Sequence, residues 1–410
     1  MTSRRYSIER DTSLDFVGQA YSTTYPNLHR YPATMIPQLG IAVLNRLGVS
    51  SGSLLDPYCG SGSSFAAGIH CGVSEVFGFD LNPLAVLISK AKFTRIGKAT
   101  TQRFKTHLLS QLESLKPARA NSSDIPEITN AEYWFSKRAI MELVAIKRVV
   151  DEIDDADVRD LVLLALSETI RDVSYTRKNE FKLYRIPPEK MSSHNPDSFA
   201  IFREYLVRIF ENYVRAYLPM LDGVKTQIEN IPFDSLSSEV DVVLTSPPYG
   251  DSRTTVAYGQ FSTLTNEWLG ISHARKIDSM LMGGRRVKSL LEESIISGEL
   301  KQIAKTDSKR ALEVSSFYSD LGTSISEVAK AVRAGGYAIY IVGNRRVKDV
   351  QLSTDQFIAE EFEKANCSHV VTFERLISSK SMPAVNSPSN KAGLTRGTMT
   401  QEFVVIVRKR

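Results

Sequence analysis

The hexapeptide Thr-Ser-Pro-Pro-Tyr-Gly at residues 245–250 combines residue types that suit chemistry on a planar amine. It follows the apolar run 240–244, which predicts a buried strand. Two successive prolines have no N–H to donate, so we expect the strand to end there and a stiff loop to follow. The Ser246 hydroxyl and the Pro247 carbonyl can both accept hydrogen bonds from an exocyclic NH2 group, and Tyr249 offers a flat face to a base. A rigid loop that merely ends a strand is the alternative interpretation.

A second cluster suits the binding of a cofactor that carries a ribose. An apolar strand pattern ends near residue 56 and runs into a turn that contains Gly60 and Gly62. These glycines permit a tight turn and a close approach of the backbone to a ligand. Asp80 stands eighteen residues after Gly62, at the end of the next apolar run. An acidic side chain in that place can bind ribose hydroxyls, although a glycine-rich turn alone is weak evidence.

Together these clusters resemble the motifs of the amino-methylating DNA methyltransferases. Asp-Pro-Tyr-Cys-Gly-Ser-Gly at 56–62, Phe-Asp-Leu-Asn-Pro at 79–83 and Ser-Pro-Pro-Tyr at 246–249 occur in that order. The family transfers a methyl group from S-adenosyl-L-methionine to N4 of cytosine or N6 of adenine in DNA. The resemblance covers residues 28–94 and 226–410. It implies S-adenosyl-L-methionine as the cofactor and double-stranded DNA as the partner, with the target base flipped out of the helix.

The resemblance also implies site residues. The residues expected to be catalytic are Ser246, Pro247, Pro248 and Tyr249. In the family a His-x-Tyr-Pro-Ala segment, here residues 29–33, lines the methionine end of the cofactor pocket. An acidic residue near position 234 contacts the adenine of the cofactor in similar proteins, while a turn aspartate is the alternative. The residues expected to bind the cofactor are His29, Tyr31, Pro32, Ala33, Asp56, Tyr58, Cys59, Gly60, Gly62, Asp80, Leu81, Asn82 and Asp234.

The first residue of the Pro-Pro loop bears on which base is methylated. Adenine-N6 enzymes usually carry Asp or Asn at this position, so Ser246 resembles the cytosine-N4 group. We therefore predict a site-specific cytosine-N4 DNA methyltransferase in a restriction–modification context. Because a serine hydroxyl can satisfy either amine, adenine-N6 methylation is the alternative. An RNA base amino-methyltransferase is less favoured. A cofactor-binding protein without turnover would predict damage to the glycine turn or the Pro-Pro loop, and both are intact.

The elements that position these motifs predict an α/β fold. Strand and helix patterns with short turns fill residues 53–94, which favours a parallel doubly wound sheet. Asn82 and Pro83 together form a helix start. Gly335 and Gly336 predict a helix stop, and further apolar runs at 337–342, 370–373 and 403–407 predict the later strands. The expected fold is the Rossmann-like seven-stranded sheet of S-adenosylmethionine-dependent methyltransferases, with a mostly helical insertion.

The length of the chain between the two motif clusters indicates that insertion. Gly62 and Thr245 lie 183 positions apart, whereas a bare core needs about 70 residues there. We expect residues 1–100 to form the N-terminal part of the core and 101–222 to form a helical insertion that can carry target recognition. Residues 223–410 then complete the core with the catalytic loop, and 270–312 form an excursion that can contact DNA.

Two segments mix basic residues with features of DNA contact. Residues 171–190 hold six Lys/Arg against three Asp/Glu and alternate with aromatics, which suits phosphate contact and base stacking. Residues 270–312 hold nine Lys/Arg against five Asp/Glu. A solvated loop and a surface helical hairpin are the respective alternatives. The residues expected to bind DNA are Tyr175, Arg177, Lys178, Lys182, Arg185, Arg253, Arg285, Arg286 and Lys288.

Composition limits the remaining possibilities. The 410 residues carry a net charge of +5, which is compatible with a polyanionic partner without requiring one. Three cysteines fit neither a disulfide framework nor a zinc cluster, so no metal is expected. No apolar run reaches membrane-spanning length, and no apolar segment follows residues 1–5 as in a secretory signal. We expect a cytoplasmic protein, with a cognate restriction endonuclease as a candidate partner and the oligomeric state left open.

Overall fold

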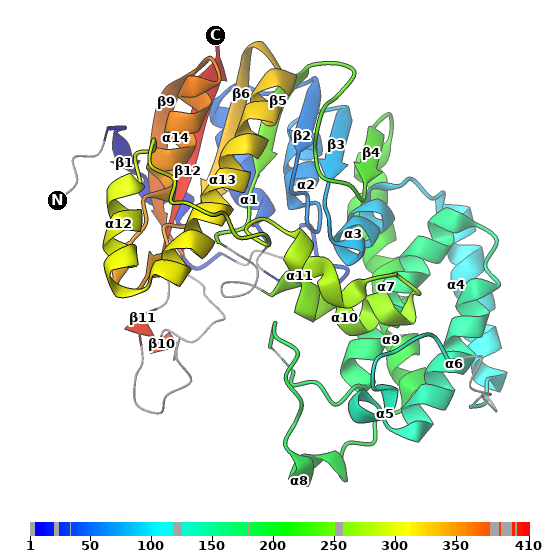
Figure 1. The fold of residues 1–410 in the computed structure, drawn as a ribbon. Helices are drawn as coiled ribbons and strands as arrows, with labels where there is room; N and C mark the ends of the chain where they lie inside the picture. Colours follow the sequence, from blue (N-terminus) through cyan, green and yellow to red (C-terminus); the bar gives the residue numbers. More distant parts are fainter. Residues whose placement is uncertain are drawn as a thin grey trace.

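A mixed sheet of eight strands forms the centre of the molecule in the computed structural model (Figure 1). The structure describes residues 5–19, 24–32, 34–117, 125–178, 180–250, 257–377, 385–386, 396–397 and 400–410. The strand order is β1-β9-β12-β6-β5-β2-β3-β4. The strands span Ile8–Arg10 (β1), Ser53–Asp56 (β2), Glu75–Phe79 (β3), Lys225–Glu229 (β4), Val240–Thr245 (β5), Val332–Val342 (β6), Cys367–Leu376 (β9) and Gln401–Lys409 (β12). Only β12 runs antiparallel to its neighbours in this sheet. The predicted Rossmann-like α/β sheet is confirmed.

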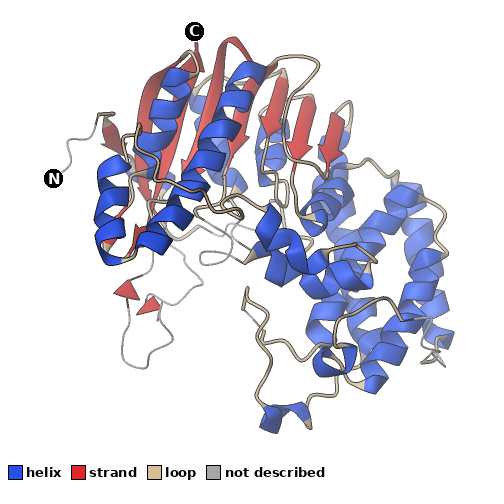
Figure 2. Cartoon of the chain, viewed as in Figure 1, coloured by secondary structure: helices blue, strands red, loops and turns tan. Residues whose placement is uncertain are grey.

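Helices cover both faces of the sheet, because successive strand residues point to opposite sides (Figure 2). Val242 and Leu244 of β5 pack into a core cluster with one set of helices, whereas Val243 packs into the cluster on the other face. The first set comprises α1 (Pro37–Arg46), α2 (Ser63–His70) and α3 (Pro83–Phe93). The second comprises α12 (Ser297–Thr306), α13 (Ser308–Ala331) and α14 (Thr354–Lys364). The two apolar layers fix which loops emerge at the carboxyl edge of the parallel strands.

Two features of the sheet differ from the sequence-based expectation. The predicted sheet had seven strands, but β1 adds an eighth at the edge, parallel to β9. Three residues are too few for an alternating pattern to reveal a strand. Gly335 and Gly336 do not stop a helix either, since α13 ends at Ala331 and β6 runs through both glycines. A Cβ at Gly336 would lie 2.8 Å from the Asp241 carbonyl oxygen, so glycine permits the close approach of β5.

The described chain between α3 and β4 is mostly helical, as predicted, and lies beside the sheet in Figure 1. It shares a continuous apolar core with the first set of helices, in which α7 packs against α3. The helices span Lys98–Ser114 (α4), Ala131–Trp134 (α5), Lys137–Asp151 (α6), Ala156–Val173 (α7), Pro188–Met191 (α8) and Ser198–Asn212 (α9), followed by Tyr213–Tyr217 (η3) and Leu218–Leu221 (η4). The division into domains at residues 100 and 222 stays a prediction.

The predicted excursion at 270–312 lies along α13, and its last part, α12, packs against α13. Its role in contacting DNA stays a prediction. Short helices α11 (Ile277–Met280) and η5 (Ala274–Lys276) follow α10 (Tyr258–Trp268), and an extended segment then runs along α13. The Val287 N–H donates to the Ser316 hydroxyl at 2.9 Å. Smaller elements complete the chain: η1 (Thr12–Leu14), the pair β7 (Arg346–Val347) and β8 (Val350–Gln351), and the pair β10 (Val385–Asn386) and β11 (Arg396–Gly397). Within the described ranges, no helix has both the length and the apolar character to cross a membrane.

The packing of β6 gives a stability prediction. Ile339 is fully buried in the central strand β6, and we expect Ile339→Ala to lower the free energy of unfolding by about 2–5 kcal/mol because it leaves a cavity. Ile231→Ala is the matched control, since 47% of that side chain is exposed and its loss should cost less than about 0.5 kcal/mol. Urea unfolding followed by circular dichroism measures both. Equal losses in the two variants would contradict the assignment of the core.

Candidate active site

A buried carboxylate joins the carboxyl ends of β2 and β5. One oxygen of Asp56 accepts a hydrogen bond from the Thr245 hydroxyl at 2.6 Å and another from the Tyr58 N–H at 3.0 Å. The other oxygen accepts from the Ser64 hydroxyl. Burial raises the pKa of Asp56 to about 6, although these hydrogen bonds act in the opposite direction. Since Ser246 directly follows Thr245, this contact brings the glycine turn and the Pro-Pro loop to one edge.

The glycine turn has the backbone conformation that only glycine adopts readily. Gly60 has φ +49° and Gly62 has φ +75°. A Cβ at Gly62 would lie 2.5 Å from Phe93, which means that the turn is packed tightly against α3. A Cβ at Gly60 would be in ordinary van der Waals contact with the Tyr31 ring at 3.8 Å and with the Tyr58 carbonyl oxygen at 3.9 Å. The turn therefore leaves room for a small group between Gly60 and Tyr31.

Asp80 lies directly beyond β3, beside this turn. Its carboxylate accepts the Gly60 N–H at 3.0 Å and the Asn82 N–H at 2.8 Å. Burial raises the pKa of Asp80 to about 6. Within the described ranges, no Lys or Arg forms an ion pair with it. The half-buried carboxylate therefore offers acceptor capacity to a neutral donor such as a hydroxyl.

Asn82 connects the turn to the aromatic residues above it. Its carbonyl oxygen caps α3 by accepting the Leu84 N–H at 3.2 Å. Its amide donates to the Tyr31 hydroxyl at 3.0 Å and to the Tyr258 carbonyl at 3.3 Å. The Tyr31 and Tyr258 rings stack with centroids 5.9 Å apart. Tyr258 is the first residue of α10, next to the first described residue after the Pro-Pro loop, Ala257.

Lys92 stabilises the same turn through a hydrogen bond, and no local pattern in the sequence predicts this role. Its ammonium group donates to the Ser61 carbonyl at 2.8 Å, and the side chain is only 2% exposed. Burial lowers the pKa of Lys92 to about 7. Lysines within helices normally face water, so sequence pattern alone assigns this residue to the surface.

The arrangement fits the cofactor that the sequence resemblance implies. The Asp80 carboxylate suits the hydroxyls of a ribose, and the room beside Gly60 allows a close approach of the backbone. Tyr31 provides an aromatic wall over this space. Asp80, Gly60, Tyr31 and Asn82 would hold S-adenosyl-L-methionine at this edge.

The other residues predicted to bind the cofactor differ in their burial and in the elements that they face. His29 is buried, and its Nε2 lies 2.7 Å from the Ser167 hydroxyl of α7, so it faces the insertion. Burial lowers the pKa of His29 to about 4. The Tyr58 hydroxyl bonds to Ser324 of α13, on the opposite side of the sheet. Asp234 is exposed in the loop after β4. Pro32 and Cys59 are buried, Leu81 is half-buried beside Asp80, and Ala33 lies outside the described residues.

The Pro-Pro loop is anchored by a residue that sequence reasoning missed. The Ser246 hydroxyl lies 3.4 Å from the Tyr249 hydroxyl, which in turn donates to the Glu402 carboxylate of β12 at 2.9 Å. Arg375 lies 3.5 Å from the same carboxylate. Burial, and then the charge of Glu402, raises the pKa of Tyr249 well above its ordinary value. Because 153 positions separate Tyr249 from Glu402, no local pattern connects them.

The residues predicted to bind DNA fall into two separate groups. Tyr175, Arg177, Lys178, Lys182 and Arg185 lie between α7 and α8, in the insertion. Arg285, Arg286 and Lys288 lie on the segment along α13, where Arg286 pairs with Glu313 at 3.0 Å. Arg253 lies outside the described residues.

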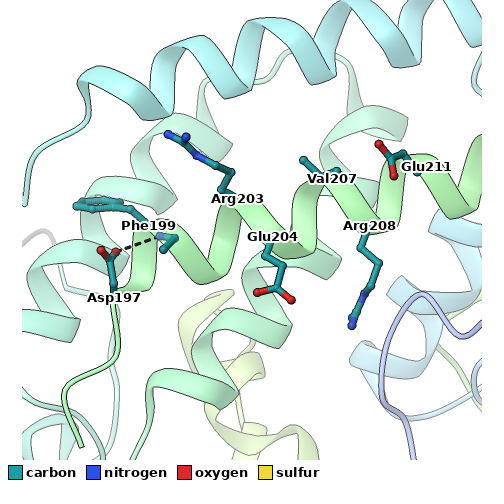
Figure 3. Close-up of a pocket in the computed structure, with 8 residues that line it drawn as sticks. Asp197, Phe199, Arg203, Glu204, Val207, Arg208 and Glu211 are labelled. Atoms are coloured by element: carbon teal, nitrogen blue, oxygen red, sulfur yellow. Dashed lines mark hydrogen bonds between the residues drawn. The ribbon is translucent and has the colours of Figure 1, made fainter.

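A groove lies along α9 (Figure 3). Figure 3 shows charged side chains of both signs along this helix, with Arg203 and Glu211 on one side and Glu204 and Arg208 on the other. Such a mixed surface suits neither a polyanion nor a nucleobase. Among the described residues, no group of three or more His, Cys, Asp or Glu side chains could hold a metal ion.

Known proteins similar to this chain are methyltransferases. The type II methyltransferase M.MvaI of Kocuria varians is 35% identical over 412 residues, which covers 93% of this chain and 90% of that protein. The type II methyltransferase M.MjaII of Methanocaldococcus jannaschii is 23% identical over 219 residues, or 52% of this chain and 38% of that protein. No protein-family model matches the chain.

Solved structures give weaker likenesses. The rRNA methyltransferase aviRa of Streptomyces viridochromogenes has a TM-score of 0.31 and 12% identity, and the comparison covers 99% of this chain and 96% of that one. A SAM-dependent methyltransferase of Methanosarcina mazei has a TM-score of 0.30 and 9% identity, with 93% and 98% covered. The fold assignment rests on the strand order and not on these scores.

The contact between Asp56 and Thr245 predicts a pH-dependent loss of stability. Burial raises the pKa of folded Asp56 above its ordinary value, so the contribution of this group to stability falls as pH rises through about 6. Thr245→Val removes one donor from the carboxylate. We expect the free energy of unfolding to fall by about 1.5–3 kcal/mol at pH 8, where Asp56 is charged, and by about 0.5–1.5 kcal/mol at pH 5.

Urea unfolding at the two pH values measures the difference. Thr323→Val is the control, because that hydroxyl bonds only to the Ser319 carbonyl on the exposed side of α13. A Thr245→Val deficit that is the same at both pH values would show that Asp56 does not titrate as proposed.

Proposed function

The chain belongs to the type II DNA methyltransferases, and from this premise we propose that it methylates the exocyclic N4 amine of a flipped cytosine at a specific site in double-stranded DNA. The observation that carries the proposal is the junction of Asp56 with Thr245, which brings Ser246 to the same edge as the cofactor-binding turn. Ser246 favours cytosine because it is a small, neutral acceptor. Adenine-N6 methylation is the alternative and keeps the same geometry.

Ser246 and Pro247 are proposed to orient the target amine. An exocyclic amine is a poor nucleophile because its lone pair is delocalised into the ring. A hydroxyl that donates to Tyr249 still has lone pairs with which to accept one N–H of the amine. The Pro247 carbonyl oxygen is proposed to accept the other. Two fixed acceptors favour a pyramidal nitrogen whose lone pair points at the methyl group. Because the loop is rigid, these acceptors are preorganised for the amine.

S-adenosyl-L-methionine is the cofactor, and when bound it supplies a methyl group on a positively charged sulfonium. No strong base is needed before attack, since this group is a good methyl donor and the amine proton can leave afterwards. The role of the chain is therefore to place nitrogen, methyl carbon and sulfur in line. We propose that Asp80 binds the ribose, Gly60 allows close approach, and Tyr31 and Asn82 close the pocket. His29, Pro32 and Asp234 remain proposed contacts.

The wider setting is also a proposal. The insertion, residues 101–222, is proposed to carry target recognition, and the basic residues between α7 and α8 and along α13 are proposed to contact DNA. A restriction–modification context would supply a cognate endonuclease that is blocked by the methyl mark. DNA as substrate places the proposed activity in the cytoplasm.

The first test of the function is the identity of the methylated base. Mixed-sequence duplex DNA is incubated with tritiated S-adenosyl-L-methionine, digested to nucleosides and analysed by mass. We expect label in N4-methylcytosine and a loss of about 10²–10³-fold in Ser246→Ala, because one preorganised acceptor is gone. Ser110→Ala, at an exposed position of α4, should not change the rate.

Each other outcome has a defined meaning. Label in N6-methyladenine would keep the geometry and overturn the base assignment. Transfer to RNA but not to DNA would overturn the proposed substrate. Cofactor binding without any transfer would favour a protein that does not turn over.

Tyr249 gives a second test, of base stacking. Tyr249→Ala removes the ring, and we expect kcat/KM to fall about 5- to 150-fold because stacking contributes about 1–3 kcal/mol. Tyr249→Phe keeps the ring but loses the bond to Glu402, so its loss should be smaller. Fluorescence of 2-aminopurine at the target position measures flipping in both variants. A Tyr249→Ala enzyme that flips and methylates like the wild type would exclude the stacking role.

A further inference from the structure

The chain between α7 and α8 forms a short antiparallel hairpin rather than a loose loop. We call residues 175–186, described except at position 179, the basic hairpin. Thr176 pairs with Arg185 as an antiparallel bridge. The Arg177 N–H donates to the Tyr184 carbonyl at 2.8 Å, and the Ile186 N–H donates to the Tyr175 carbonyl at 2.7 Å. The hairpin extends from the helices of the insertion beside α8 (Figure 1).

The basic hairpin is fixed next to the candidate active site through α10. The Leu183 N–H donates to the Gln260 side chain at 3.3 Å. Arg171, which precedes the hairpin, donates to the Phe261 carbonyl at 3.2 Å, and its guanidinium lies 4.0 Å from the Phe261 ring centroid. Gln260 and Phe261 occupy the first turn of α10, directly after Tyr258, which stacks on Tyr31. If the target base is held at the Pro-Pro loop, the base pairs that flank it would therefore lie near the hairpin.

The Arg185 guanidinium lies against two aromatic rings. Its guanidinium carbon lies 4.0 Å from the Tyr133 ring centroid and 5.4 Å from that of Tyr175. Tyr133 is 48% exposed, so this stack is at the surface. In the described part of the chain no carboxylate pairs with Arg185, and its buried Nε has no hydrogen-bond partner. Two aromatic rings therefore fix the plane of a guanidinium that donates to no other residue within the described ranges.

The charges of the hairpin differ from those along α13. Among the described residues, Arg177, Lys178 and Lys182 form no ion pair with a carboxylate. Arg286, in contrast, is paired with Glu313. The backbone around it is also held against α13, where the Leu291 N–H donates to the Ser315 hydroxyl at 3.3 Å. Among the described residues, the hairpin therefore has cations without a carboxylate partner and one exposed aromatic ring, that of Tyr184, whereas the segment along α13 has its central arginine paired.

We propose that the basic hairpin reads the bases that flank the target, and that Arg185 recognises a guanine in the major groove. The inference rests on the proposed DNA methylation and deepens it by naming a specificity-determining residue. A planar guanidinium is matched to the O6 and N7 acceptors of guanine, and a stack that fixes its plane reduces the freedom lost on binding. Arg177, Lys178 and Lys182 contact phosphates and position the hairpin, without reading sequence.

The test is a map of the methylated positions in DNA of random sequence. Sequencing of modified bases defines the flanking preference of the wild-type enzyme, which we expect to require guanine at one or more positions. In Arg185→Ala the preference for guanine at one position should fall about 5- to 150-fold, while the other positions keep theirs. Arg185→Lys keeps the charge but loses the planar fork, so it should lose most of the same preference.

Controls separate reading from positioning and from misfolding. Lys178→Ala should weaken methylation of all sequences evenly and reduce the salt dependence of DNA binding by about one phosphate contact. Arg285→Ala should leave the sequence preference unchanged. Titration with S-adenosyl-L-methionine, followed by tryptophan fluorescence, should give wild-type affinity in every variant and so report an intact fold.

The inference fails if Arg185→Ala keeps the full guanine preference, or if the wild-type preference contains no guanine. It also fails if Arg285→Ala, and not Arg185→Ala, relaxes the sequence preference. The proposed cytosine-N4 activity fails in a different way. In that case the modified nucleoside in the same DNA is N6-methyladenine, while Arg185→Ala still changes the flanking preference. Absence of methylated DNA altogether would overturn both.

Discussion

The arrangement of the candidate active site depends on one buried carboxylate. Asp56 ends β2, and its hydrogen bond from Thr245 joins it to the end of β5. A buried carboxylate without partners would cost several kcal/mol, so Ser64, Tyr58 and Thr245 must all be in place when it is charged. This requirement fixes the distance between two loops that are far apart in the chain. The glycine turn and the Pro-Pro loop are therefore positioned by the same group.

The insertion is attached to the core by buried polar contacts as well as by apolar packing. Arg30, next to His29, donates its N–H and its guanidinium to Glu168 of α7 at 2.7 Å, and Glu168 is fully buried. Breaking such a pair would leave an uncompensated charge, so the segment before α1 and the insertion are held in one orientation. That orientation is what allows a hairpin on α7 to lie beside a pocket built from β2, β3 and β5.

The features that the sequence predicts well are local in the chain. A strand, a turn and a helix start follow one another around Gly60 and around Asn82, and the proline pair ends β5 directly after Thr245, so residue types and spacing indicate these positions. Glu402 and Lys92 were missed for a different reason. Tyr249 reaches Glu402 across the sheet, and Lys92 points inward from a helix, so only the packed structure reveals their roles. The edge strand β1 was missed because three residues carry no periodic pattern.

The active-site network and the basic hairpin are separate regions, so specificity and chemistry can change independently. The residues around Asp56, Asp80 and Ser246 lie at the ends of central strands, where a substitution disturbs a shared network of hydrogen bonds. In the described part of the chain the basic hairpin reaches this network through α10, by the contact of Leu183 with Gln260 and, just before the hairpin, of Arg171 with Phe261. Its other stabilising contacts, the stack of Tyr133 and Tyr175 on Arg185 and the paired backbone, are internal to the insertion. Substitutions in the proposed reading surface can therefore alter which sequence is bound without moving the acceptors that orient the amine.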